Sequence, residues 1–280
     1  MAQEWPPWFK AGGVGCLAVS ALSVVVVLAV YAFVRLSGER DIHSREALSR
    51  VLPDASSFTP AGDRSLAPER LEAFLAVRRR LAVHCQEFAG IESAFARMDS
   101  YDGSAGSPSA AESDPGGFAR DLGRALKAFV SVARRLGAYL ETRNRTLLEE
   151  GMGLGEFTWI QVVAYHAWLG EPTRRFVLAR PDEPRVFQDR VVPQVREMIR
   201  RHLAASERAG APGIELAPWR RELAALDRNP ERVPFADGPP PALAGSLEPY
   251  REALRSVWCP ATQELDLVVT VRDGLGFEHL

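Results

Sequence analysis

Hydrophobic patterning separates one long apolar run near the start of the chain from a series of amphipathic segments. Residues 13–36, GVGCLAVSALSVVVVLAVYAFVRL, contain no acidic residue and no lysine, and Arg35 is the only charge among them. A helix of this length crosses the hydrocarbon core of a bilayer, which needs about 20 apolar residues. We therefore predict a short N-terminal tail over residues 1–12, a transmembrane anchor over 13–36, and a linker with a short helix over 37–66.

Two long amphipathic helices are predicted at the start of a soluble, mainly α-helical bundle domain that spans residues 67–280. The first begins at Pro68 and runs to about Met98, and the second runs over about 118–150. Between them, residues 99–117 are rich in small and polar side chains and cannot offset the entropy of ordering, so we expect a flexible loop. The stripe of the first helix consists of Phe74, Val77, Leu81, His84, Phe88, Ile91, Phe95 and Met98.

Three consecutive arginines, Arg78, Arg79 and Arg80, fall away from the centre of this stripe. A run of like charges on a helix usually forms a face in contact with water, where the charged heads stay solvated. We therefore expect all three side chains to be exposed. Binding of anionic lipid headgroups is the alternative interpretation of this run.

A third helix is predicted over residues 156–169, EFTWIQVVAYHAWL, which are apolar on nearly every side. Such a helix is buried on all faces, which places it at the centre of the bundle. Trp159 and Tyr165 would bury large areas, and their N–H and O–H groups need partners there. The three glycines that precede it indicate a turn between helices, because a dinucleotide-binding loop follows a strand.

Proline positions set the expectations for the next helix, which we place from Pro184 to about Arg208. Pro193 lies inside this apolar pattern, and a proline within a helix removes one backbone hydrogen bond. It either kinks the helix near Arg190 or lies in the first turn of a helix that begins at Val192.

The C-terminal third is predicted to contain two shorter helices and an extended end. We place the helices over 218–226 and 247–258, with a stiff, extended, proline-rich linker over 230–241 between them. Residues 265–272 alternate between apolar and polar side chains, which favours an extended conformation. Because a lone strand is unstable, this tail either packs along helices or pairs with another copy.

Charge and cysteine content narrow the function classes. The net charge of −2 provides no concentrated basic face, so we expect no nucleic-acid partner. Of the three cysteines, Cys16 lies in the apolar run, while Cys85 and Cys259 lie in the soluble part. The latter two could form a disulfide if the domain is exported. Two buried thiols are the simpler interpretation.

Two opposing arguments bear on which side of the membrane the soluble domain lies. Lys10 precedes the apolar run, whereas Arg40, Arg45 and Arg50 come after it, and positive charge favours the cytoplasmic side. Short N-terminal anchors, however, commonly leave their tail inside and export the domain on their C-terminal side. We predict a single-pass protein of the cell membrane, within a bacterial envelope, whose soluble domain is extracytoplasmic. A cleaved signal peptide is the alternative, although this apolar run is long for one.

No residue pattern in the chain matches a catalytic, cofactor-binding or metal-binding motif. His84 and Glu87 share a helix face, but di-iron bundles use the opposite order, Glu-x-x-His, twice. Nucleophile-elbow and zinc-protease motifs are missing from the sequence. Glu156 and His166 are the best candidates for an unrecognised site.

These observations favour a membrane-anchored helical binding or scaffolding protein that is not catalytic and needs no cofactor or metal. Its expected partners are the membrane and either another protein or a second copy of itself. The alternative is a membrane-bound hydrolase or metal-dependent enzyme with a site near Glu156 and His166. A third interpretation is an envelope component that oligomerises through its C-terminal tail.

Overall fold

The structure is a computed structural model that describes residues 43–44, 46–52, 57–61, 65–91, 115–173 and 186–267. These residues are mostly helical and include no strand, which confirms a mainly α-helical domain. The predicted N-terminal tail and the anchor at 13–36 lie outside the described residues. Within the described ranges, no helix combines the length and the apolar character needed to span a bilayer.

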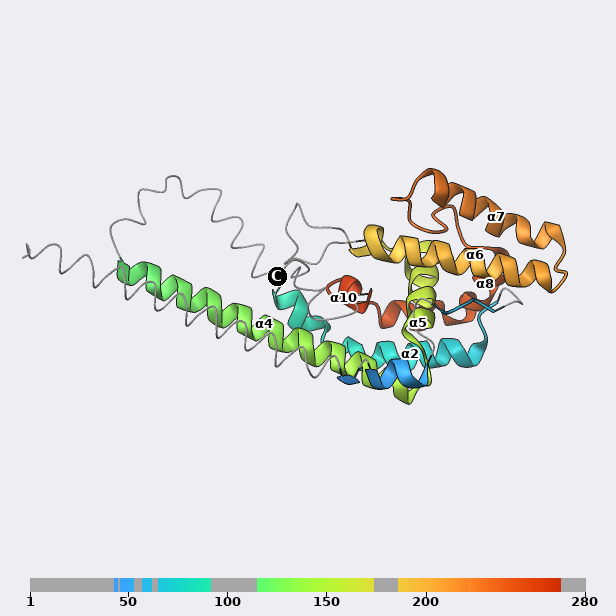
Figure 1. The fold of residues 1–280 in the computed structure, drawn as a ribbon. Helices are drawn as coiled ribbons and strands as arrows, with labels where there is room; N and C mark the ends of the chain where they lie inside the picture. The colour runs from blue at the N-terminus through green and yellow to red at the C-terminus, as the bar shows by residue number, and fades with distance from the viewer. Residues whose placement is uncertain are drawn as a thin grey trace, which may run out of the picture.

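The two long helices lie side by side and antiparallel. Helix α2 (Pro68–Ala82) carries its proline in the first turn, and α4 (Pro115–Glu149) extends well beyond the other helices (Figure 1). The second long helix is therefore confirmed, but the first is interrupted. A turn at 83–84 separates α2 from a second helical segment at 85–91. Residues 92–98 and the predicted loop up to residue 114 lie outside the described part of the chain.

The central helix is confirmed, with a change of geometry that the sequence did not indicate. Helix α5 (Leu154–Gln161) continues directly into a π-helical segment, η2 (Val162–Trp168). Figure 1 shows α5 crossing between α2 and α6. Trp159 is 1% exposed and stacks on Trp219, with ring centroids 5.8 Å apart. Its indole N–H has no hydrogen-bond partner among the described residues, contrary to expectation.

Pro193 lies in the first turn of an α-helix that directly follows a π-helical segment. The π-helical segment η3 (Phe187–Val191) contains Arg190 and runs without a break into α6 (Val192–Arg208). The α-helix therefore begins at the residue that the second alternative gave, and the change of helical geometry lies where the first alternative placed a kink. Helix α7 (Gly213–Arg228) then packs against α6. It begins five residues earlier than predicted and carries Pro218 within it.

The proline-rich linker is not extended, which corrects the prediction for 230–241. It forms a series of turns that place Phe235 in the core with only 2% exposure. The ring of Phe235 meets those of Trp159 and Trp219 edge-on, at 6.0 and 5.7 Å between centroids. Its backbone has a φ of +56°, and its N–H donates to the Glu222 carboxylate at 2.6 Å.

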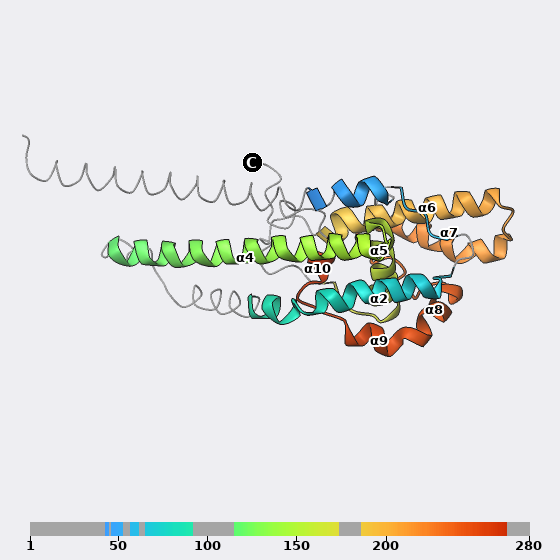
Figure 2. The same cartoon turned by 90° about the horizontal axis from the view of Figure 1, so that it is seen from below.

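The described part of the C-terminal region consists of short helices, with a loop at 257–262 before the last of them. Helix α8 (Pro241–Leu247), a 3₁₀ turn η4 (Glu248–Tyr250) and α9 (Arg251–Ser256) follow one another, with α8 and α9 beside α2 in Figure 2. Helix α10 (Gln263–Leu267) then overlaps the first three residues of the region predicted to be an extended tail. That prediction is wrong for residues 265–267, and the rest of the tail lies outside the described residues.

Candidate functional site

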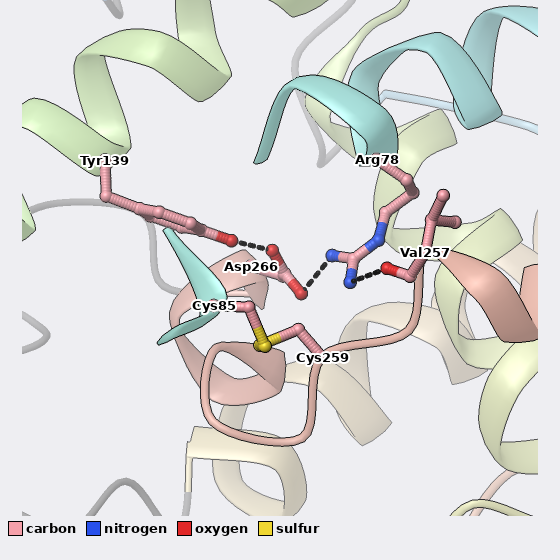
Figure 3. The surroundings of a disulfide bond; sticks show 6 residues. All are labelled: Arg78, Cys85, Tyr139, Val257, Cys259 and Asp266. Atoms are coloured by element: carbon pink, nitrogen blue, oxygen red, sulfur yellow. Dashed lines mark hydrogen bonds and ion pairs between the residues drawn. A yellow bond between two sulfur atoms is a disulfide. The ribbon is translucent and has the colours of Figure 1, made fainter. Parts of the chain in front are cut away.

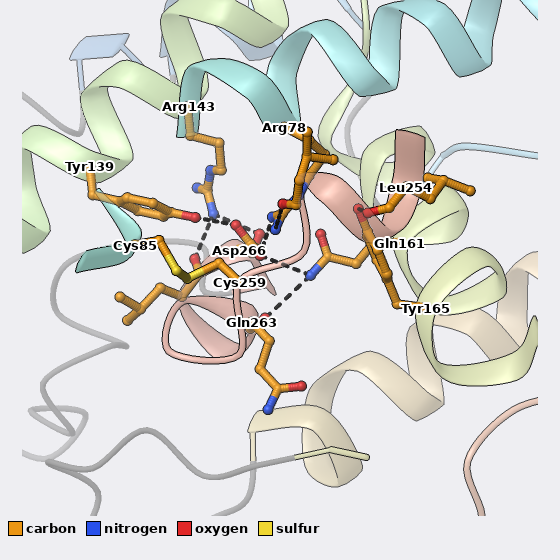
Figure 4. A network of polar contacts seen from close by, with 12 residues as sticks. Arg78, Cys85, Tyr139, Arg143, Gln161, Tyr165, Leu254, Cys259, Gln263 and Asp266 are labelled. Atoms are coloured by element: carbon orange, nitrogen blue, oxygen red, sulfur yellow. Dashed lines mark hydrogen bonds and ion pairs between the residues drawn. A yellow bond between two sulfur atoms is a disulfide. The ribbon is translucent and has the colours of Figure 1, made fainter. Parts of the chain in front are cut away.

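Several buried polar and charged side chains meet around Asp266, a fully buried aspartate on α10 (Figures 3 and 4). One carboxylate oxygen accepts hydrogen bonds from Arg78 of α2 and from Gln161 of α5, the latter at 3.1 Å. The other oxygen accepts a hydrogen bond from the Tyr139 hydroxyl of α4. Burial and the nearby carboxylate raise the pKa of Tyr139, which keeps its hydroxyl a donor. Asp266 therefore joins α10 to three helices.

Arg78 is 1% exposed, so the expectation that it lies on a solvated face is wrong; Arg79 and Arg80 are exposed as predicted. Nη2 of Arg78 donates a hydrogen bond to the Val257 carbonyl at 3.2 Å. Its guanidinium also lies 5.5 Å from the ring centroid of Tyr165. Burial opposes the charged form, but Asp266 and the neighbouring tyrosines hold the pKa of Arg78 above its ordinary value. The side chain therefore stays charged inside the core.

A second buried arginine, Arg143 of α4, binds the backbone of α10. Its Nη1 donates to the carbonyls of Leu265 and Asp266 at 3.1 and 2.9 Å. These carbonyls lie near the end of the helix, where backbone acceptors lack helical partners. Arg143 also donates to the side-chain oxygen of Asn144, whose amide donates to the Ser44 hydroxyl at 3.1 Å. The α10 contacts are thereby linked to residues near the N-terminal end of the described chain.

A disulfide joins Cys85 to Cys259 next to this cluster (Figure 3). The two Cα atoms are 5.7 Å apart, although 174 residues separate them in sequence. The interpretation as two buried thiols is therefore wrong. The bond ties the segment at 85–91 to the loop before α10, the helix that carries Asp266.

Glu156, one of the two residues predicted for an unrecognised site, is paired with an arginine. Both of its carboxylate oxygens accept from Arg70, at 2.6 Å to Nε and 2.6 Å to Nη2. Arg70 also donates to the Gly151 carbonyl at 3.1 Å. Such a two-pronged pair has a fixed geometry, and here it joins the first turns of α2 and α5. The Glu156 carboxylate therefore serves to hold α2 and α5 together.

His166, the other predicted residue, lies in η2 and makes separate contacts. It is 6% exposed, and its Nδ1 lies 2.9 Å from the Glu171 carbonyl oxygen. Because a carbonyl only accepts, Nδ1 carries the hydrogen and Nε2 presents a lone pair in the neutral ring. Nε2 is buried without a hydrogen bond in the described part of the chain. Burial lowers the pKa of His166 and favours this neutral form.

A small pocket opens beside His166, between η2, η3 and α10. Its volume, including the mouth, is about 170 Å³, below the roughly 300–1,000 Å³ of typical small-molecule sites. Glu264, 6% exposed, also lines it, 98 residues away from His166 in sequence. No local spacing could have revealed this pairing. The lining residues are His166, Thr173, Phe187, Gln263, Glu264 and Leu267.

The remaining candidate ligands do not gather at this pocket. Nδ1 of His84 lies 3.6 Å from a Glu87 oxygen, and its ring packs edge-on against Tyr139 at 5.6 Å. Glu149 faces Arg80 and Arg145 at 3.8 and 3.9 Å. Over the described ranges, no three His, Cys, Asp or Glu side chains are arranged to hold a metal ion.

Comparison with known proteins yields no relative: no protein-family model, no curated protein and no solved structure matches this chain. The interpretation of the site therefore depends on its own contacts. Its charged groups link helices, and the pocket beside His166 is small.

Proposed function

We propose that this chain is a single-pass membrane protein whose helical domain lies on the extracytoplasmic side and acts as a binding or scaffolding unit. The disulfide between Cys85 and Cys259 is the observation that carries the proposal. Structural disulfides persist in oxidising compartments and are rare where glutathione and thioredoxin keep thiols reduced. This favours export and outweighs the arginines on the C-terminal side of the predicted anchor.

The carboxylates of Asp266 and Glu156 are both held by hydrogen-bond donors, which supports a binding role over catalysis. A general acid or base needs a titrating group that can reach a substrate. Asp266 is buried beneath three donors, and Glu156 is held by both prongs of Arg70. The pocket at His166 has room for a small ion or water rather than a substrate. The hydrolase alternative therefore loses the pairing of Glu156 with His166 on which it depended.

A topology experiment tests the location. Alkaline phosphatase or green fluorescent protein is fused after Leu280 of the full chain in a bacterial host. The extracytoplasmic arrangement predicts active phosphatase and dark fluorescent protein, because each reporter matures on only one side. Fluorescence without phosphatase activity would refute the proposed location.

A thiol experiment on the unfused chain tests the disulfide in the same cells. Cells are lysed directly into a denaturant that contains a maleimide and no reductant, so that a buried free thiol such as that of Cys259 would also react, and the mass increase is measured. Wild type and the double variant Cys85→Ser, Cys259→Ser should react equally, because a paired cysteine does not alkylate. Additional labelling of the wild type in two places would show that both thiols are free, and the location would then lose its support.

A further inference from the structure

We propose that one face of the domain, formed by the helical segment at 46–51 and the last turns of α4, lies against the bilayer and contacts anionic lipid headgroups. The inference rests on the proposed membrane anchor. Two independent features support it: the length of chain between anchor and domain, and the exposed arginines of that face.

The tether is short because the chain becomes fixed to the domain soon after the predicted anchor. The Asn144 amide of α4 donates to the Ser44 hydroxyl at 3.1 Å, and Leu48, 4% exposed, is packed into the core. Ser44 follows Leu36, the predicted end of the anchor, by eight residues. Eight residues span at most about 29 Å when fully extended and about 12 Å as a helix. Ser44 must therefore lie within about 29 Å of the bilayer surface, and Asn144 is hydrogen-bonded to it.

Arginines surround this attachment point. The side chains of Arg50, Arg80 and Arg145 are 76%, 62% and 59% exposed. Arg145 is next to Asn144 in sequence, and Arg80 reaches the same end of α4 through Glu149 at 3.8 Å. Arg50 pairs with the exposed Glu46 at 3.1 Å, whereas Arg145 and Arg80 both face Glu149. Exposed ion pairs contribute little, so these guanidiniums can exchange carboxylate oxygens for phosphate oxygens. Attraction of this kind to anionic lipid is effective only near the membrane surface.

The surface of α7 serves as the control for the proposed membrane-facing surface. Figure 1 places α7 on the far side of the body from the segment at 46–51. Ala224 is exposed on α7. A short tether at Ser44 leaves this surface farther from the bilayer than the end of α4.

Proximity is measured on the full chain in nanodiscs of phosphatidylcholine, with or without phosphatidylglycerol. A fluorophore is placed at position 145 or 224 through a non-natural amino acid, which leaves the two cysteines paired. Headgroup nitroxide lipids should quench the label at 145 and leave the label at 224 nearly unaffected. Equal quenching, or stronger quenching at 224, would overturn the proposed face.

The charge contribution is separated by a variant and by salt. Phosphatidylglycerol should increase quenching of a label at position 148, an exposed site on the same turn. The triple variant Arg50→Gln, Arg80→Gln, Arg145→Gln should lose that increase, as should wild type in about 1 M salt, where the Debye length is about 3 Å. An increase that survives both changes would overturn the headgroup contact. A chain that elutes free of lipid would instead refute the anchor, and the inference with it.

Discussion

Asp266→Ala should destabilise the domain more than a typical core exchange, because it removes the carboxylate that pairs with the buried Arg78. Arg78 is 1% exposed and would keep its charge without a partner of opposite sign. Breaking a buried ion pair from one side costs about 3–5 kcal/mol. Tyr139 and Gln161 would also lose an acceptor, at about 1–3 kcal/mol for each unsatisfied group.

These contributions do not simply add, because water can enter the space that the alanine leaves. We therefore expect the whole change to lower the free energy of unfolding by about 3–5 kcal/mol. For a domain of this size, that corresponds to a fall in Tm of roughly 6–20 °C. Urea unfolding of the detergent-solubilised full chain, followed by tryptophan fluorescence, measures it. Trp159 and Trp219 are stacked in the core and should report the loss of packing.

Two variants make the experiment specific. Arg79→Ala alters the neighbouring exposed arginine and should change stability by no more than about 0.5 kcal/mol. The double variant Arg78→Met, Asp266→Leu replaces the pair by apolar side chains and should recover the part of the loss that the unpaired charge causes, whereas Tyr139 and Gln161 still lack their acceptor. A loss below about 1 kcal/mol for Asp266→Ala would refute the reasoning. It would mean that α10 is not held in the core as the structure has it.

Three further predictions concern other parts of the core. Trp159→Ala should cost about 3–5 kcal/mol in the same urea assay, and a loss under about 1 kcal/mol would mean that α5 is peripheral. Cys85→Ser with Cys259→Ser should cost about 2–5 kcal/mol, because the bond closes a loop of 174 residues; an unchanged midpoint after reduction would contradict this. Burial lowers the pKa of His166, so the unfolded chain binds the proton first, and stability should fall as the pH drops below about 6.5. His166→Phe should flatten that part of the pH profile, and an identical slope in both proteins would exclude His166 as its source.

The position of Asp266 changes what a deletion of the C-terminal tail can test. Deletion of residues 264–280 would be a test of oligomerisation only if the tail were peripheral. It instead removes most of α10 and the carboxylate that Arg78 and Tyr139 share. We therefore expect that deletion to unfold the domain, and a change in its sedimentation would not demonstrate self-association.

Local patterns succeeded where the environment of a residue depends on its close neighbours in sequence. The apolar character of residues 156–169 on every side correctly predicts that α5 is buried. Pro193 lies in a first turn because proline lacks the N–H that a helix interior requires. In contrast, Phe235 stands in a proline-rich stretch with no periodicity, and only its contacts with Trp159 and Trp219 reveal it as a core residue.

The sequence by itself determined the mainly helical class, the central helix and the apolar run at 13–36, because hydrophobic period and length are local properties. It could not distinguish Arg78 from Arg79, nor pair Cys85 with Cys259, because those outcomes depend on partners more than 170 residues away. A buried charge is tolerated only where an opposite charge meets it. Tertiary structure alone therefore decided that one arginine of three lies in the core and that Asp266 of α10 meets it there.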